Sequence, residues 1–156
     1  MHVEERGSGH PVVLCHGFPE LSYSWRHQLP ALAAAGYHAM APDQRGYGRS
    51  PIPDAVEDYD IVHLTDDLLR LLDERGLERA AFAGHDWGAL VVWSLALRAP
   101  DRVAGVAGLS VPYQRRGVMG SRAAIERASG DAWFYILHFQ EPGLADAELN
   151  RDPATT

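Results

Sequence analysis

The stretch Gly84-His85-Asp86-Trp87-Gly88 decides how this chain folds. It lies between a short apolar run at 80–83 and an apolar segment at 89–99 with helical periodicity. Glycines two residues before and two after a reactive side chain are typical of a nucleophile elbow, a strained turn from strand to helix that leaves no room for side chains at the glycines. The residue at the tip, Asp86, is a carboxylate. A carboxylate that attacks carbon forms an alkyl ester, which water must then open.

The composition indicates a single acidic globular domain. With 156 residues, of which 46% are hydrophobic, the chain is long enough for one packed core. A formal net charge of −7 and the lack of a basic run argue against a nucleic-acid surface. No apolar stretch approaches the roughly 20 residues that cross a bilayer, and the N-terminus does not resemble a signal peptide. We therefore expect a cytoplasmic protein that binds neither nucleic acid nor a membrane.

The first fifteen residues predict two strands joined by a turn. Residues 2–6 alternate weakly in polarity, and residues 7–11 form a turn cluster of Gly, Ser, His and Pro. Val12 to Cys15 is a continuous apolar run, which is typical of a strand buried on both faces. We expect the two strands to pair as a hairpin. Cys15 is the single cysteine, so no internal disulfide forms, and we interpret it as a small buried side chain.

Helical and strand patterns alternate over the following hundred residues. The helical stretch 24–35 contains Pro30, so we expect its first turn to be separate from the rest. Asp60 is a predicted N-cap for the next helix, which Gly76 closes. Further elements are expected as strands at 37–41, 80–83 and 103–109 and a helix at 89–99. This order implies a parallel α/β sheet with right-handed crossovers.

Two glycine-containing segments are not nucleotide-binding loops. Gly7-x-Gly9 lacks the third glycine of a dinucleotide fingerprint, and no helix follows it directly. The loop at 43–50 lacks the Gly-Lys-Ser/Thr ending of a phosphate loop. We interpret it as an ordered loop in which Arg45 or Arg49 pairs with an acid.

The character of the chain changes after residue 112. Residues 113–130 are polar and basic, and we interpret them as a solvated linker or helix. Residues 131–140 are rich in aromatic side chains and are followed by a Glu-Pro-Gly break. Residues 145–150 could begin another helix. The sequence therefore predicts two parts, at 1–112 and 113–156.

Three motifs in order resemble one known family. They are HGFPE at 16–20, GHDWG at 84–88 and WFYILHFQEPG at 133–143, and they resemble the α/β-hydrolase-fold epoxide hydrolases. The match is collinear over nearly the whole chain but covers only about the first half of the family's domain. The resemblance implies an incomplete α/β-hydrolase fold, with a mostly parallel sheet and helices on both of its faces. Residues 1–112 would be the N-terminal part of the core, and residues 113–156 the beginning of a truncated helical cap.

The resemblance also implies roles for four residues. Asp86 would be the nucleophile that attacks a small hydrophobic epoxide. The backbone N–H groups of Phe18 and Trp87 would form the oxyanion hole. Tyr135, four residues before the pair Phe139-Gln140, would donate a proton to the departing oxygen. The family further suggests a cis bond before Pro19.

The histidines are assigned structural roles. We expect His16 to stabilise its loop by hydrogen bonds and His85 to be structural. No pair among the eight histidines has the spacing H-x-H or H-E-x-x-H, so no metal is expected. No organic cofactor is indicated either, and water is the co-substrate that the chemistry requires.

Several parts of the family's machinery have no counterpart in the 156 residues. They are the general-base histidine, its acid partner and a second cap tyrosine, all of which come late in the family's chain. We therefore expect a truncated chain that cannot turn over and is at best alkylated once at Asp86. A strand at 103–109 with an open edge would favour poor solubility or association, so a homo-oligomer is one expected state.

Two alternative functions stay open. Haloalkane dehalogenases resemble this scaffold and also use an elbow aspartate followed by tryptophan, but they need halide-binding donors in place of Tyr135. Fluoroacetate-type dehalogenases carry arginine where this chain has Trp87. The second alternative is a non-catalytic ligand-binding or interaction protein.

Overall fold

The chain folds into two compact units. The structure, a computed structural model, describes residues 1–114, 122–130 and 132–152. The first unit comprises Met1–Tyr113 and the second Gln114–Thr156. The predicted assignment of residues 113–156 to a cap stays a prediction.

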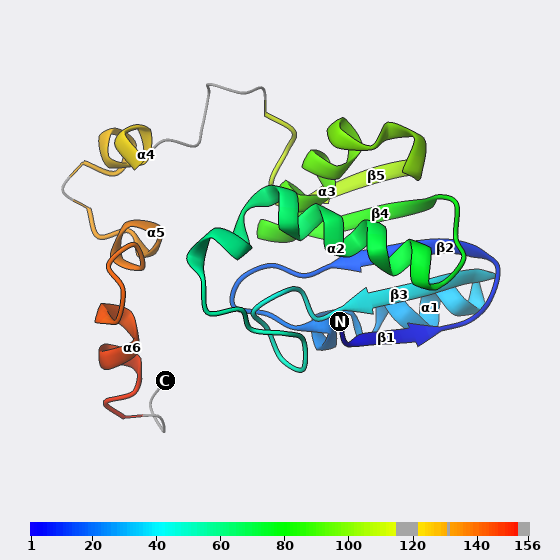
Figure 1. The fold of residues 1–156 in the computed structure, drawn as a ribbon, viewed down its shortest axis with the longest axis horizontal. Coiled ribbons are helices and arrows are strands. Elements are labelled where there is room, and N and C mark those ends of the chain that lie inside the picture. The colour runs from blue at the N-terminus through cyan, green and yellow to red at the C-terminus, as the bar shows by residue number, and fades with distance from the viewer. Residues whose placement is uncertain (115–121, 131, 153–156) are drawn as a thin grey trace. The chain divides into compact units, whose positions relative to one another are not determined.

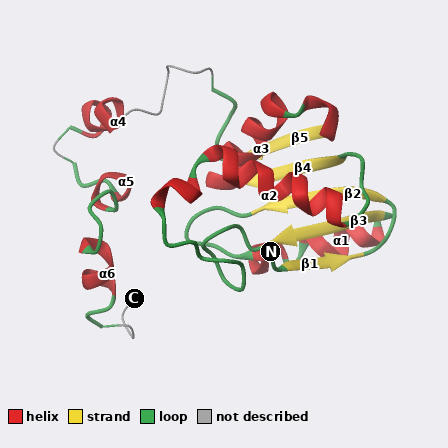
Figure 2. Cartoon of the chain, in the orientation of Figure 1, coloured by secondary structure: helices red, strands yellow, loops and turns green. Residues whose placement is uncertain are grey.

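The first unit contains a five-stranded sheet in the order β1-β3-β2-β4-β5 (Figures 1 and 2). All neighbouring strands are parallel except β1 and β3. The strands are β1 (Val3–Arg6), β2 (His10–Cys15), β3 (Tyr37–Pro42), β4 (Ala80–His85) and β5 (Val103–Leu109). The α-helices of this unit are α1 (Gln28–Ala34), α2 (Ile61–Glu74) and α3 (Trp87–Arg98), and short 3-10 helices span Ser22–Trp25, Val56–Tyr59 and Pro100–Arg102.

The predicted hairpin between the first two strands is wrong. β1 pairs antiparallel with β3, and its register runs from Val3 opposite Pro42 to Arg6 opposite Ala39. β2 instead lies between the parallel strands β3 and β4. The physical reason is burial: the apolar end of β2 requires a neighbour on each side, whereas the polar sequence of β1 suits the edge of the sheet.

The predicted helix boundaries are confirmed at several points. A separate 3-10 helix precedes α1, whose third residue is Pro30, where a missing N–H breaks no bond within the helix. The side chain of Asp60 accepts a hydrogen bond from the His63 N–H at 2.8 Å and so caps α2. Gly36 and Gly76, both with positive φ, follow α1 and α2.

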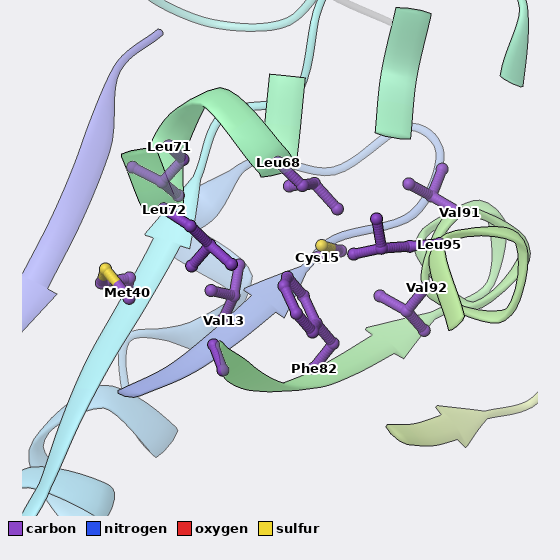
Figure 3. Packing of buried hydrophobic residues seen from close by; sticks show 11 residues of the cluster. Val13, Cys15, Met40, Leu68, Leu71, Leu72, Phe82, Val91, Val92 and Leu95 are labelled. Atoms are coloured by element: carbon purple, nitrogen blue, oxygen red, sulfur yellow. The ribbon is translucent and has the colours of Figure 1, made fainter. Parts of the chain in front are cut away.

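Two hydrophobic clusters form the core of the first unit. α2 and α3 cover one face of the sheet, where side chains of β2, β3 and β4 pack against them (Figure 3). Members of that cluster include Val13, Cys15, Met40, Leu68, Leu71, Leu72, Phe82, Val91, Val92 and Leu95. The second cluster joins β2, β3, α1 and the 3-10 helix before α1. Burial raises the pKa of the Cys15 thiol to about 12, as expected for a thiol inside an apolar core.

In the described residues of the second unit the chain forms three short helices. They are α4 (Arg122–Ser129), α5 (Tyr135–His138) and α6 (Leu144–Leu149). The His138 ring lies 2.8 Å from a carboxylate oxygen of Glu148 and so links α5 to α6. Aromatic rings of this unit also meet, as in the edge contact of Tyr135 with Phe139 at 6.0 Å. Within the described ranges of both units, no helix is long and apolar enough to cross a membrane.

The core cluster under α2 predicts a large stability difference between two leucines. Leu72 is fully buried, whereas Leu97 on α3 is 67% exposed. Replacing Leu72→Ala leaves a cavity, so we expect the free energy of unfolding to fall by about 2–5 kcal/mol. The matched Leu97→Ala variant should change it by less than about 0.5 kcal/mol. Urea unfolding followed by circular dichroism measures both, and equal losses would contradict the observed packing.

Candidate active site

The elbow forms at the junction of β4 and α3. Asp86 adopts φ 53° and ψ −119°, a conformation that non-glycine residues rarely take. Its backbone is held on both sides, because its N–H donates to the carbonyl of Leu109 at 3.2 Å and its carbonyl accepts from Ala89 N–H at 3.0 Å. Strain of this kind persists only where the surrounding structure fixes it, and it is concentrated at functional sites.

Glycines are required on each side of Asp86. A side chain at Gly84 would overlap the carbonyl of Gly88, and one at Gly88 would overlap the carbonyls of Cys15 and His16. These overlaps involve backbone atoms, which cannot move aside as a flexible side chain can. The close approach brings the elbow against the end of β2.

The carboxylate of Asp86 is bonded to the turn that follows β2. Its Oδ1 accepts a hydrogen bond from the backbone N–H of Phe18 at 3.1 Å. Asp86 occupies the N-cap position of α3, but its side chain makes no capping bond. The peptide bond between Phe18 and Pro19 is cis, as predicted. The structure therefore brings Asp86 and the Phe18 N–H together, and the carboxylate bonds to this turn instead of capping the helix it precedes.

Trp87 is the first residue of α3. The first N–H groups of a helix have no acceptor within the helix, so the Trp87 N–H is of the kind available to a ligand. The indole side chain is 43% exposed. Its roles as backbone donor and pocket wall stay predictions.

His16 holds the turn that carries Phe18. The side chain is completely buried, and its Nδ1 lies 2.8 Å from the carbonyl oxygen of Gly17. The backbone N–H of Gln44 donates a hydrogen bond to Nε2 at 3.0 Å, so Nε2 is unprotonated and Nδ1 carries the ring's proton. Burial lowers the pKa of His16, which keeps the ring neutral in this tautomer. The predicted structural role of His16 is confirmed by these bonds.

A second link joins the turn to the elbow. The Oε2 of Glu20 accepts from the Gly17 N–H at 3.2 Å and lies 3.2 Å from Nδ1 of His85. Glu20 comes from the turn and His85 from the elbow, so this pair ties the two segments together beside Asp86. No role for Glu20 was predicted from the sequence. Its position as the last residue of the HGFPE motif was the available signal.

The loop after β3 supports the same turn from the other side. The Asp43 carboxylate accepts from the backbone N–H groups of Ser22 at 2.9 Å and Arg49 at 3.1 Å. Burial acts to raise the pKa of Asp43, but the hydrogen bonds from Ser22 and Arg49 outweigh it and the pKa is lowered. The loop is ordered as predicted: Arg45 makes a two-pronged ion pair with Asp67 at 2.8 and 2.7 Å. Arg49 pairs with Glu4 at 2.8 Å.

Tyr135 belongs to α5 of the second unit. Its ring makes edge contacts with the rings of Phe134 and Phe139, with distances of 5.3 and 6.0 Å between ring centroids. Asp86 and Tyr135 lie in different units, so the role of Tyr135 as proton donor stays a prediction. In the part of the chain that the structure describes, no group of three His, Cys, Asp or Glu side chains is placed to hold a metal ion.

A mostly parallel sheet with helices on both faces and a strained elbow after β4 is the arrangement of an α/β-hydrolase fold. A family model of the alpha/beta hydrolase fold matches residues 10–146. The chain belongs to this family.

Within the family, the chain is homologous to epoxide hydrolases. Epoxide hydrolase A of Mycobacterium tuberculosis is 61% identical over 155 residues, covering 99% of this chain and 48% of that relative. Bifunctional epoxide hydrolase 2 of Sus scrofa is 45% identical over 152 residues, which are 97% of this chain and 27% of the relative. The crystal structure of epoxide hydrolase A from Mycobacterium thermoresistibile superposes with a TM-score of 0.92 at 62% identity, covering 97% of this chain and 49% of that chain. The chain thus spans about half the length, or less, of these relatives.

The close approach at Gly88 predicts that this position tolerates no side chain. Gly88→Ala should lower the free energy of unfolding by about 3 kcal/mol or more, because the added methyl group meets two backbone carbonyls. Gly105 on β5 is the matched control, since a Cβ there meets nothing within 4 Å. Gly105→Ala should be neutral or slightly stabilising. Thermal unfolding of both variants checks this, and a stable Gly88→Ala protein would contradict the elbow geometry.

The buried neutral His16 predicts a pH-dependent loss of stability. Its folded pKa lies below the ordinary value of about 6.5, so at pH values between the two the unfolded chain binds more protons than the folded chain. The contribution is fully present above pH ~6.5 and is lost as the pH falls toward the folded pKa. We expect His16→Gln to reduce the difference in unfolding free energy between about pH 7.5 and about pH 5.5.

The control for this pH dependence is the exposed His27. His27→Gln should retain the pH dependence of the unmodified chain. An unchanged pH dependence in His16→Gln would show that protonation of His16 does not limit stability.

Proposed function

We propose that this chain carries the nucleophile of an epoxide hydrolase site, which opens epoxides to diols through an aspartyl ester. The observation that carries the proposal is the hydrogen bond from Phe18 N–H to Oδ1 of Asp86 at the tip of a strained elbow. This hydrogen bond gives the two carboxylate oxygens of Asp86 different environments. Oδ1 is bonded to a backbone donor, and Oδ2 is the oxygen that attacks.

Ester formation begins with attack on an epoxide carbon. The Oδ2 lone pair forms a C–O bond while the ring C–O bond breaks, and the departing oxygen takes up a proton. A strained three-membered ring with a single carbon–oxygen leaving group suits a carboxylate nucleophile. Tyr135 is the proposed proton donor, because its spacing before Phe139-Gln140 matches the family's cap tyrosine.

Opening of the ester uses the same oxyanion donors. When water adds to the ester carbonyl, negative charge develops on Oδ1, which already accepts from the Phe18 N–H. The Trp87 N–H, at the start of α3, is the second proposed donor. Donors fixed before the reaction stabilise this charge without reorganisation. The links through His16 and through Glu20 and His85 serve to hold the Phe18 donor in place.

Activation of that water requires a general base. The family's base histidine has no matching position in the 156 residues, so we propose that these residues, tested by themselves, accumulate the ester and do not turn over. The proposed substrates are small hydrophobic epoxides and water. The names of the relatives, which are epoxide hydrolases, support this substrate class over haloalkanes.

Intact-protein mass spectrometry tests the proposal. After incubation with styrene oxide, the chain should gain the mass of one epoxide molecule, and peptide mapping should place the gain at Asp86. Asp86→Asn removes the nucleophilic oxygen but keeps the size of the side chain, so its adduct should disappear. Asp101→Asn, at an exposed acid outside the site, should keep the adduct.

The same experiment distinguishes the alternatives. Sustained diol formation without an adduct would overturn the proposed stalled ester. An adduct from a bromoalkane with release of bromide, and none from the epoxide, would favour dehalogenase chemistry. No adduct in protein shown to be folded by circular dichroism would contradict an active nucleophile.

A further inference from the structure

A second hollow lies in the first unit, outside the candidate active site. Its volume is about 540 Å³, and it is lined by β1, the 3-10 helix Ser22–Trp25, α1 and the loop at 43–49. None of its lining residues is Asp86, Phe18 or Trp87. A volume of this size is within the range of small-molecule pockets, roughly 300–1,000 Å³.

Three arginines line this hollow in a chain of net charge −7. Arg6 donates to the carbonyl of Glu5 at 2.7 Å, and Arg26 donates to the carbonyl of Tyr23 at 3.1 Å. Among the described residues neither guanidinium has a carboxylate partner. Each bond uses one N–H of a five-donor fork, so both arginines retain donors for a ligand.

The acidic residues of the hollow are already engaged. Glu4 pairs with the third arginine, Arg49, at 2.8 Å. Asp43 is buried, and each of its carboxylate oxygens accepts a backbone N–H, from Ser22 and from Arg49. Asp43 has no ionic partner in the described part of the chain either, but its oxygens are bonded to backbone donors. Arg6 and Arg26 are therefore the charged side chains of the hollow that keep unused hydrogen-bonding capacity for a ligand.

Apolar surface lies beside the two arginines. Tyr23 is 69% exposed and Leu21 is 40% exposed, and both line the hollow together with Leu29 and Pro30. The guanidinium carbon of Arg26 lies 4.5 Å from the centre of the Tyr23 ring. This cation–π contact holds the planar cation over the aromatic face, so a charged and an apolar surface adjoin.

We propose that this hollow binds a small organic anion with a flat apolar body. Arg6 and Arg26 contact the anionic group, and Tyr23 and Leu21 contact the body. Carboxylates and phosphate monoesters share the chemistry that two guanidinium forks recognise. The site is distinct from the proposed epoxide chemistry, because none of Asp86, Phe18, Trp87 and Tyr135 lines the hollow. Arg6, Arg26 and Tyr23, which would bind the anion, have no role in the active site.

Titration of the whole chain by NMR with three matched naphthalene probes tests the site. The probes are 2-naphthoate, 2-naphthyl phosphate and the neutral 2-naphthylmethanol. We expect the two anions to shift the same resonances with saturation and the alcohol to bind at least roughly tenfold more weakly, because it lacks the charge-assisted bonds. A preference for one anion over the other identifies the headgroup.

Variants assign the binding to the named residues. Arg6→Gln and Arg26→Gln, both at exposed positions, should each weaken binding of either anion by roughly tenfold. Arg79→Gln is the matched control, since Arg79 is also exposed and bonded to a backbone carbonyl, that of Val103, but lies outside the hollow. Tyr23→Ala should weaken binding of the naphthyl anions more than binding of inorganic phosphate, because phosphate has no apolar body to contact the ring.

Three results in the comparison of probes and variants would overturn the proposal. They are equal affinity for the neutral alcohol, an affinity that neither Arg6→Gln nor Arg26→Gln alters, and an equal loss in Arg79→Gln. Absence of saturable binding by both anions to folded protein would also overturn it. None of these results bears on adduct formation at Asp86, so the two proposals fail independently.

Discussion

The hydrogen bond between the Phe18 N–H and the Asp86 carboxylate is the point on which the site depends. It joins segments 68 residues apart in sequence. The two meet because β2 and β4 are parallel neighbours, with Cys15 opposite Gly84 at their carboxyl ends. Ligands of open α/β sheets bind at this end of the strands, where loops from adjacent strands lie side by side. Gly17 allows the close approach, since a Cβ there would lie 2.6 Å from Cβ of Asp86.

Support for this bond comes from the loops that follow three adjacent strands. The loop after β3 contributes Gln44, whose N–H fixes His16, and Asp43, which binds the backbone at Ser22. The buried imidazole in turn fixes the Gly17 carbonyl, one residue before the Phe18 donor. Buried polar groups, each with a hydrogen-bond partner, therefore fix the turn that carries the Phe18 donor. The position of the Asp86 carboxylate thus depends on buried residues of the neighbouring loops.

Local rules predicted much of this arrangement, and the failures have physical reasons. The elbow, the N-cap at Asp60 and the break before Pro30 follow from glycine, capping and proline chemistry within a few residues. The pairing of β1 with β3 could not be predicted from such rules. A cluster of turn residues indicates that the chain reverses, but it does not indicate which strand β1 pairs with. The link from Glu20 to His85 was missed for the same reason: it spans 65 residues, and neither side chain reveals its partner. The pairing of Tyr135 with Asp86 involves both units and stays a prediction.

The burial of Cys15 has a practical consequence. It is the chain's single thiol, and it lies in the core cluster at the end of β2 with no exposed surface. Its pKa of about 12 leaves almost no thiolate at neutral pH, and only the thiolate reacts with alkylating or disulfide reagents. The rate at which such a reagent labels the chain therefore reports how often the sheet and the helices α2 and α3 separate. The protein thus contains its own probe for the opening of the core beneath the elbow.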